Sequence, residues 1–296
     1  MFSVAIFVLC CQCFVGCQTL KPFSQSMRTR VAAARQWSGS GFDAIKRGAV
    51  CEARECFAKA SSQLPNDHRI VANVARTHFQ EGQTQQAIEF MQQAIDLSGN
   101  DAELNVELGE YYLADGQLQA AERQVQRSLK KKHRLASAWL LKGKTKAARG
   151  DIKAALGDYQ RALGIDGSRE DIQLQIVDSY QQLGDPLRAL SAVEQLLDKY
   201  PTERQPETAI LAKSSALLKL DQHRPAIEVL KIASQRSDVS SNVFVALALT
   251  QISSGRQELA LQTLQQAQQR FPQEMQIAKY VDQLKSDENL RVAQLK

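Results

Sequence analysis

The fold is decided by residues 34–67, which read ARQWSGSGFDAIKRGAVCEARECFAKASSQLPND. The rest of the chain returns to the pattern of this stretch at a fixed interval. A glycine recurs every 34 residues, at Gly48, Gly82, Gly116, Gly150 and Gly184. An alanine recurs in the same frame at Ala53, Ala87, Ala121, Ala155 and Ala189, and after one longer interval of 37 residues at Ala226 and Ala260. Self-similarity at a fixed period of about 20–50 residues indicates a structure built from stacked repeats.

Each column of the pattern has a physical reason in a pair of antiparallel helices. The Gly48 column follows the first helix, where a left-handed backbone costs glycine no steric strain. The Ala53 column lets the two helices approach closely, and bulky residues such as Phe57 fill the space between them. Pro65 ends the second helix. Because one pair of this size cannot bury its apolar face alone, neighbouring pairs must stack to form the core.

The order of these residues resembles the tetratricopeptide repeat family. The first unit carries Trp37, Gly41, Gly48, Ala53, Phe57, Ala60 and Pro65, with Ala44 where the family has a tyrosine. The resemblance implies an all-α fold, a right-handed superhelical solenoid of about seven helix pairs closed by a C-terminal capping helix. The expected repeats are residues 34–67, 68–101, 102–135, 136–169, 170–203, 207–240 and 241–274, and the expected capping helix is 275–296.

Composition narrows the remaining possibilities. The chain has 296 residues, of which 44% are hydrophobic and 23% are charged, with a net charge of +5. These values exclude a disordered chain of low hydrophobicity and a collagen-like fibre. Cys51 and Cys56 lie too far apart along one helix for a disulfide, so we expect both to be small buried residues.

The N-terminal residues are expected to be a targeting segment rather than part of the repeats. Residues 2–16 are almost entirely apolar, and Phe14-Val15-Gly16-Cys17 resembles the lipobox of bacterial lipoprotein signal peptides. This resemblance implies lipidation at Cys17, with residues 1–17 as the signal segment and residues 18–33 as a tether. Gln18 in place of an aspartate then favours the outer membrane, facing the periplasm.

Two departures keep an alternative open for this segment. Phe14 stands where the family usually has leucine, and basic residues follow the apolar run instead of preceding it. Under the positive-inside rule, that asymmetry favours an uncleaved anchor with its C-terminal side in the cytoplasm. An ordinary signal peptide also remains open.

Three features that look like ligand-binding motifs have simpler explanations. Residues 143–145, Gly-Lys-Thr, resemble the end of a phosphate-binding loop, but Ala138 stands where that motif needs a glycine. The histidines fall in three repeats, with no two of them three or four residues apart, and predict no metal site: His68, His78, His133 and His223. The basic run 130–134 ends a second helix, where cations complement the helix dipole, although contact with acidic headgroups stays open. We therefore expect no cofactor, no metal and no nucleic-acid partner.

In the tetratricopeptide family, binding residues project from the first helices into a concave groove. The matching positions are apolar toward the C-terminal repeats, and the candidate partner-binding groove is formed by Leu140, Leu174, Leu211, Leu218, Val245, Leu249 and Ile252. Such a groove suits an amphipathic helix or an extended apolar peptide. The alternative is that the final helix folds back and covers these residues.

A neighbouring column of the same surface holds charges of alternating sign. The candidate polar groove is formed by Arg76, Glu110, Lys144 and Asp178. These charges either pair with one another, at about 0–1 kcal/mol for each exposed pair, or contact a ligand, and the sequence leaves both readings open. Asn73 and Arg76 could form half of a clamp for a peptide carboxylate, but Glu107 and Glu110 would repel that group.

These patterns together favour a non-catalytic scaffold for protein–protein interaction, tethered to a membrane of a bacterial cell envelope. Its partner would be a protein or peptide in the concave groove, and pilus, secretion or envelope assembly would be suitable settings. One alternative is a cytoplasm-facing adaptor held by an uncleaved anchor. An enzyme of murein or exopolysaccharide metabolism is less favoured, because Asp and Glu are spread singly along the chain and form no catalytic constellation.

Overall fold

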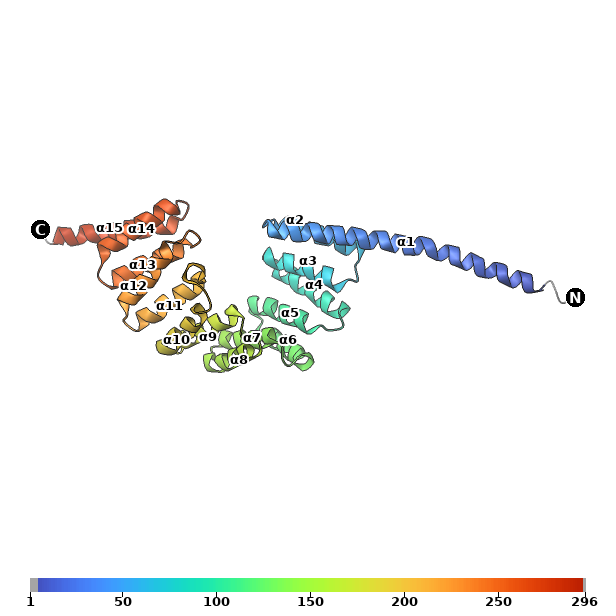
Figure 1. Cartoon of the computed structure of the whole chain (residues 1–296), viewed down its shortest axis with the longest axis horizontal. Coiled ribbons are helices and arrows are strands. Elements are labelled where there is room, and N and C mark those ends of the chain that lie inside the picture. The colour runs from blue at the N-terminus through green and yellow to red at the C-terminus, as the bar shows by residue number, and fades with distance from the viewer. Residues whose placement is uncertain (1–4, 295–296) are drawn as a thin grey trace. The chain divides into compact units, whose positions relative to one another are not determined.

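The fold is all-α. The computed structural model describes the backbone of residues 5–294 and the side chains of residues 25–285. Over residues 5–294 it contains fifteen α-helices, one short 3₁₀ helix and no strand (Figure 1). The helices are α1 (Ala5–Lys46), α2 (Val50–Gln63), α3 (His68–Gln80), α4 (Thr84–Leu97), α5 (Ala102–Ala114), α6 (Leu118–Lys131), α7 (Ala136–Ala148), α8 (Ile152–Ile165), α9 (Glu170–Gln182), α10 (Pro186–Leu197), η1 (Thr202–Arg204), α11 (Glu207–Lys219), α12 (His223–Ser234), α13 (Ser241–Ser253), α14 (Gln257–Arg270) and α15 (Met275–Gln294).

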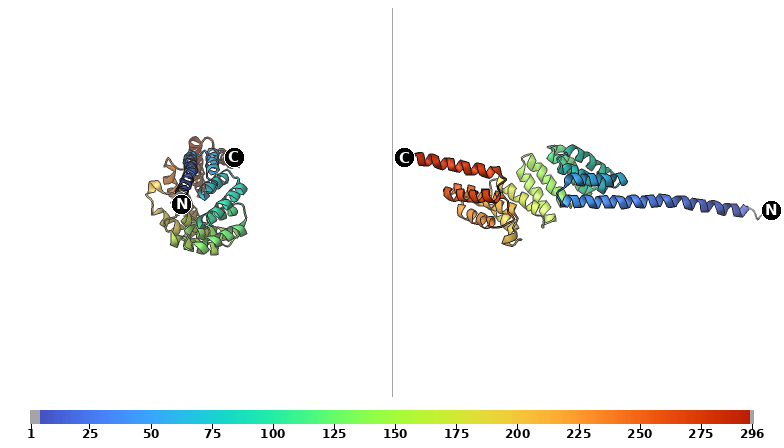
Figure 2. Two further views of the ribbon diagram at one scale, coloured as in Figure 1. Left: turned by 90° about the vertical axis from the view of Figure 1, so that its right-hand side faces the viewer. Right: turned by 90° about the horizontal axis from the view of Figure 1, so that it is seen from above.

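The chain divides into two compact units, and the division in the sequence falls within α7. Unit 1 ends at Thr145 and unit 2 begins at Lys146. In unit 1 each helix from α1 to α6 packs against the next, and in unit 2 the same holds from α8 to α15 (Figures 1 and 2). This order of contacts confirms the predicted fold class, an all-α solenoid of helical repeats.

The turn between helices is set by the glycine column. Its members adopt positive φ angles of 71–85°, which confirms the predicted left-handed conformation: Gly48, Gly82, Gly116, Gly150, Gly184 and Gly255. In the sixth repeat the same position is Asp221, which has a φ of 59°. Asparagine and aspartate tolerate this region better than other non-glycine residues.

Small residues allow the close helix contacts that the sequence predicts. All seven alanines of the Ala53 column are fully buried: Ala53, Ala87, Ala121, Ala155, Ala189, Ala226 and Ala260. A Cβ atom added to Gly41 would lie 2.8 Å from the ring of Phe57, and one added to Gly109 would lie 2.5 Å from Leu141. Both glycines therefore stand where a larger residue would collide with its neighbour.

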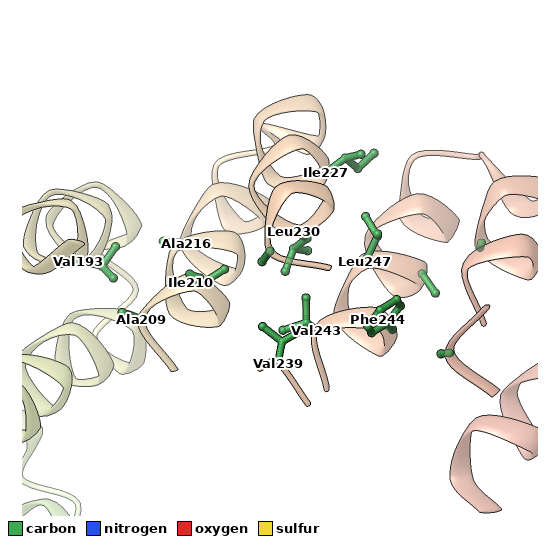
Figure 3. Packing of buried hydrophobic residues seen from close by; sticks show 14 of the residues in the cluster. Val193, Ala209, Ile210, Ala216, Ile227, Leu230, Val239, Val243, Phe244 and Leu247 are labelled. Carbon is green, nitrogen blue, oxygen red and sulfur yellow. The ribbon is translucent and has the colours of Figure 1, made fainter. Parts of the chain in front are cut away.

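Unit 2 has a continuous apolar core. Val193 of α10, Ile210 of α11 and Leu230 of α12 are buried in it, and Phe244 and Leu247 extend it along α13 (Figure 3). Each helix thus shares its apolar face with the helices before and after it, as expected when single helix pairs are too small to form a core.

A basic residue at the end of several second helices binds the carbonyl groups of the preceding repeat. Lys131 Nζ donates to Gly99 O at 2.7 Å, and Lys199 Nζ donates to Gly167 O at 3.1 Å. Arg236 and Arg270 hold the same position in the repeat and donate to Gln205 O and Arg236 O, both at 2.7 Å. These contacts satisfy carbonyls at the ends of neighbouring helices and loops and fix one repeat against the next.

One cysteine departs from expectation. Cys56 is buried, as predicted, but Cys51 is exposed, so the prediction is wrong for that residue. A hydrogen bond with Glu81 raises the pKa of the Cys51 thiol, which keeps the thiol protonated.

The first helix is longer than one repeat requires. Residues 18–33, expected to act as a tether, are helical and belong to α1 (Figure 1). Arg30 Nε donates to Gln63 O at 3.0 Å, and Ala34 is buried, so packing against α2 begins near these residues. Within the described residues no helix is both long enough and apolar enough to cross a membrane. Cys17 lies outside the residues whose side chains are described.

Candidate functional site

An apolar cleft of about 210 Å³ lies between the last three helices of unit 2. Its lining comes from α13, α14 and α15: Val245, Ala248, Leu249, Ile252, Gln257, Leu264, Tyr280, Gln283 and Leu284. Ordinary small-molecule pockets are about 300–1,000 Å³. This cleft is therefore of a size for one or two side chains of a larger partner.

The exposed wall of the cleft comes from α13, which is apolar on two sides. Phe244 and Leu247 face the core and are buried. Val245, Leu249 and Ile252 are three or four residues apart and so share another face of the helix. Leu249 is 48% exposed, which makes it the most accessible apolar residue of the cleft.

The opposite wall comes from the final helix. Ile277 and Val281 bury one face of α15 in the core of unit 2. Tyr280 and Leu284 lie beside that face and line the cleft. The final helix therefore forms one side of the cleft, and Leu249 on the other side stays accessible.

The chemistry of the cleft suits a peptide. Leu264 and Ala248 are buried and form an apolar floor. Gln257 and Gln283 contribute amide groups, which can both donate to and accept from a peptide backbone. An apolar side chain inserted between the walls would remove wet hydrophobic surface, and that is the main source of affinity at such sites.

The structure brings three of the seven predicted groove residues into this cleft: Val245, Leu249 and Ile252. Leu174 and Leu211 are half-buried against the core of unit 2 but do not line it, and Leu218 is also half-buried. Leu140 is 1% exposed, so its assignment to a binding groove is wrong. Ala72 and Val106, at the same position of the two preceding repeats, are also buried, so this position belongs to the interior in all three repeats.

The predicted polar groove forms ion pairs within unit 1, with one change of partner. Arg76 makes two hydrogen bonds of 2.8 Å to the Glu107 carboxylate. Arg76 also donates a third hydrogen bond, to Asn73 Oδ1. Pairing of Arg76 with Glu110 was one of the two readings that the sequence left open, and in the structure Arg76 pairs instead with Glu107, about one helical turn earlier in α5. The hydrogen bonds to Glu107 raise the pKa of Arg76 above its already high value. Lys144 lies 3.5 Å from Glu110.

These contacts occupy the groups that a ligand would need. The Arg76 guanidinium is held by Glu107, so it is not available as a clamp for a peptide carboxylate. In unit 2, Asp178 accepts a hydrogen bond of 2.6 Å from Gln182. The structure thus gives Arg76, Glu110, Lys144 and Asp178 contacts within the protein, and the apolar cleft remains as the candidate binding site.

A second cleft, of about 240 Å³, lies between α8, α9 and α10 and was not predicted from the sequence. Its edges are polar, with Gln160, Tyr180, Arg188 and Gln195 among its lining residues. Gln160 donates to the Tyr180 hydroxyl at 3.4 Å, and the Arg188 guanidinium lies 6.0 Å from the ring of Tyr180. These side chains contact one another across the cleft, so several of its polar groups already have partners within the protein.

A serine, a histidine and an aspartate meet at another place in unit 2. Ser253 Oγ lies 3.2 Å from His223 Nδ1, and His223 Nε2 lies 2.9 Å from Asp221 Oδ1. However, Ser253 donates its proton to Thr250 O at 2.9 Å, and the Asp221 side chain is 95% exposed. A nucleophilic serine needs its proton directed to the base, so this arrangement is not set for acyl transfer. Among the described residues, no three His, Cys, Asp or Glu side chains gather to hold a metal ion.

Comparison with known families identifies the repeats. Family models described as tetratricopeptide repeat match residues 78–144, and also residues 171–202 and 243–274. The chain therefore contains tetratricopeptide repeats in both units. The last match covers α13 and α14, which form part of the apolar cleft.

Solved structures with the same fold are distant in sequence. A tetratricopeptide repeat protein from Parabacteroides merdae superposes with a TM-score of 0.62 at 12% identity, over 86% of this chain and 99% of that one. Yeast Tom70 gives 0.68 at 12% identity, over 93% of this chain and 58% of that one. Pseudomonas aeruginosa pilF superposes with a TM-score of 0.57 at 14% identity, over 73% of this chain and 97% of that one. At these identities the likeness shows the fold alone, and no curated protein matches the chain in sequence.

Proposed function

We propose that the protein is a non-catalytic scaffold that holds a segment of a partner protein in the apolar cleft of α13, α14 and α15. The observation that carries this proposal is the solvent-exposed apolar surface of the cleft, above all Leu249, which is 48% exposed. An apolar cleft with a few polar groups at its edge is the usual form of a binding site. The tetratricopeptide repeats support a protein as the ligand.

The segment that fits would present one or two apolar side chains. These would insert between Leu249 on α13 and Leu284 on α15, above the floor formed by Leu264. Gln283 would bind the backbone of the same segment through its side-chain amide. An amphipathic helix or an extended apolar peptide meets both requirements.

The N-terminal segment would tether this scaffold to a membrane. The lipobox-like sequence that ends at Cys17 supports a lipoprotein of a bacterial cell envelope, facing the periplasm from the outer membrane. Pilus, secretion or envelope assembly are the processes in which such a scaffold should be sought. The alternative arrangement is an uncleaved anchor that holds the scaffold in the cytoplasm.

A charge at Leu249 tests the cleft. We expect Leu249→Glu to reduce partner binding at least tenfold, because an inserted apolar group would have to desolvate a carboxylate. Far-UV circular dichroism should be unchanged, since the side chain is half-exposed. The matched control is Leu259→Glu on α14, where the leucine is 45% exposed but does not line the cleft.

The partner can be identified from the same two positions. A photo-crosslinking amino acid at position 249 should capture a defined segment of one partner in cells, which mass spectrometry locates, and position 259 should not. Binding of that purified segment to wild type, Leu249→Glu and Leu259→Glu is then measured by calorimetry. Equal affinity for all three proteins would contradict the assignment of the cleft as the binding site.

A further inference from the structure

The start of the chain carries charges of one sign only. Residues 1–42 contain Lys21, Arg28, Arg30 and Arg35 and no aspartate or glutamate. The first acidic residue is Asp43, which lies 3.4 Å from Lys46. The repeats that follow mix both signs, so the excess of positive charge belongs to α1.

The structure separates these arginines into two faces of α1. Arg30 is turned toward α2, where it binds the Gln63 carbonyl. Arg28 and Arg35 are seven residues apart and therefore share a face about 140–160° around the helix from Arg30. Both side chains are exposed, and neither makes an ion pair or hydrogen bond within the part of the chain whose side chains are described.

The face continues with an apolar residue at its C-terminal end. Phe42 lies seven residues after Arg35 and is 50% exposed. Its ring meets Phe57 edge-on at 5.2 Å between centroids, so it is fixed on the surface of the first repeat. We call Arg28, Arg35 and Phe42 the outer face of α1.

We infer that the outer face of α1 binds the anionic headgroups of a phospholipid membrane. Two free guanidinium groups on one face match phosphate-bearing headgroups in charge, and a half-exposed phenylalanine suits the boundary with the acyl chains. The apolar run of residues 2–16 precedes these arginines in the sequence. If that run is attached to a membrane, it would bring the arginines close to the membrane surface. The inference rests on the proposed membrane tether and adds to it a second, electrostatic attachment.

The expected effect follows from the number of charges. Each Lys or Arg close to an anionic surface changes a partition coefficient about fivefold. Replacing both Arg28 and Arg35 by glutamine should therefore weaken the preference for anionic membranes by about 25- to 30-fold. The preference should vanish in 1 M salt, where the Debye length falls to about 3 Å.

The test uses the full chain and vesicles of two compositions. Binding to pure phosphatidylcholine measures the tether, and the additional binding to vesicles with 30% phosphatidylglycerol measures the outer face. The variants are Arg28→Gln with Arg35→Gln, and a control, Arg123→Gln with Arg224→Gln, which removes two exposed arginines from α6 and α12. Circular dichroism checks that both remain folded.

The outcomes separate the inference from the proposal beneath it. Loss of the phosphatidylglycerol preference in the α1 variant, with the control unchanged, supports the outer face as the lipid site. Equal binding to both vesicle types by wild type leaves the tether standing and overturns the inference. Binding to neither vesicle contradicts the tether as well. An α1 variant that keeps the phosphatidylglycerol preference of wild type also overturns the inference, because Arg28 and Arg35 are then not the lipid contacts.

Discussion

Gly109 gives a sharp test of how closely the helices of unit 1 pack. A Cβ at this position of α5 would lie 2.5 Å from Leu141 Cδ2 and 3.3 Å from Gln124 Cβ. Carbon atoms in contact prefer about 3.5–4.0 Å, so Leu141 would have to move by about 1 Å. Because Leu141 is fully buried, it has little room to do so.

The magnitude of Gly109→Ala follows from two opposing terms. Overpacking of a core costs about 1–3 kcal/mol. Replacing glycine by alanine within a helix raises the free energy of unfolding by about 1 kcal/mol. Because the contact with Leu141 is so short, we expect an overpacking cost of about 2–3 kcal/mol. After the gain from alanine is subtracted, the free energy of unfolding should fall by about 1–2 kcal/mol.

Gly157 supplies the matched control. It lies within α8, and a Cβ added there would meet no atom within 4 Å. Gly157→Ala should therefore raise the free energy of unfolding by up to about 1 kcal/mol. Urea denaturation followed by circular dichroism measures both variants. If Gly109→Ala proves as stable as wild type, the close approach of α5 to Leu141 is not a constraint on the fold, and our reasoning is refuted.

Two further predictions concern the joints between repeats and the N-terminus. Arg270→Met removes hydrogen bonds to Ser234 O and Arg236 O and should lower the stability of unit 2 by about 1–2 kcal/mol in a urea titration, whereas Lys153→Met, at an exposed site, should change it by less than about 0.5 kcal/mol. If Cys17 is the lipidated residue, mass spectrometry of the membrane-bound protein should show a mature N-terminus at Cys17 with acyl chains, and Cys17→Ser should lose them; an intact Met1 would contradict lipidation.

The repeat frame was predictable from the sequence because its signals are local. A glycine in the left-handed conformation and an alanine at a helix contact are each required by one turn or one pair of helices. The sixth repeat shows the limit of this reasoning, because Asp221 adopts the glycine conformation without being glycine. The carbonyl contacts of Lys199 and Arg270 were missed for a related reason: their basic column is interrupted by Leu97 and Ile165, so it does not stand out as a repeat position.

The site was only partly predictable because it depends on contacts between helices. The repeat pattern places Leu140 on a first helix, but the packing around α7 decides that it is buried. Arg76 pairs with Glu107 instead of Glu110, a change of one turn that depends on how α3 and α5 are offset. Tyr280 and Leu284 complete the cleft from α15, and their role follows from where that helix packs.

The position of the cleft at the end of a row of helices has a consequence for how a partner binds. α15 packs against α14 and has no later helix to cover it within the described residues. Elements with few packed neighbours open more readily than those in the middle of a core. A partner that bridges α13 and α15 would add contacts to α15, and part of its binding free energy would stabilise the packing of that helix. Affinity at the cleft and amide-proton protection of the last helix would then rise and fall together, so the C-terminal end of the chain would report whether the scaffold is loaded.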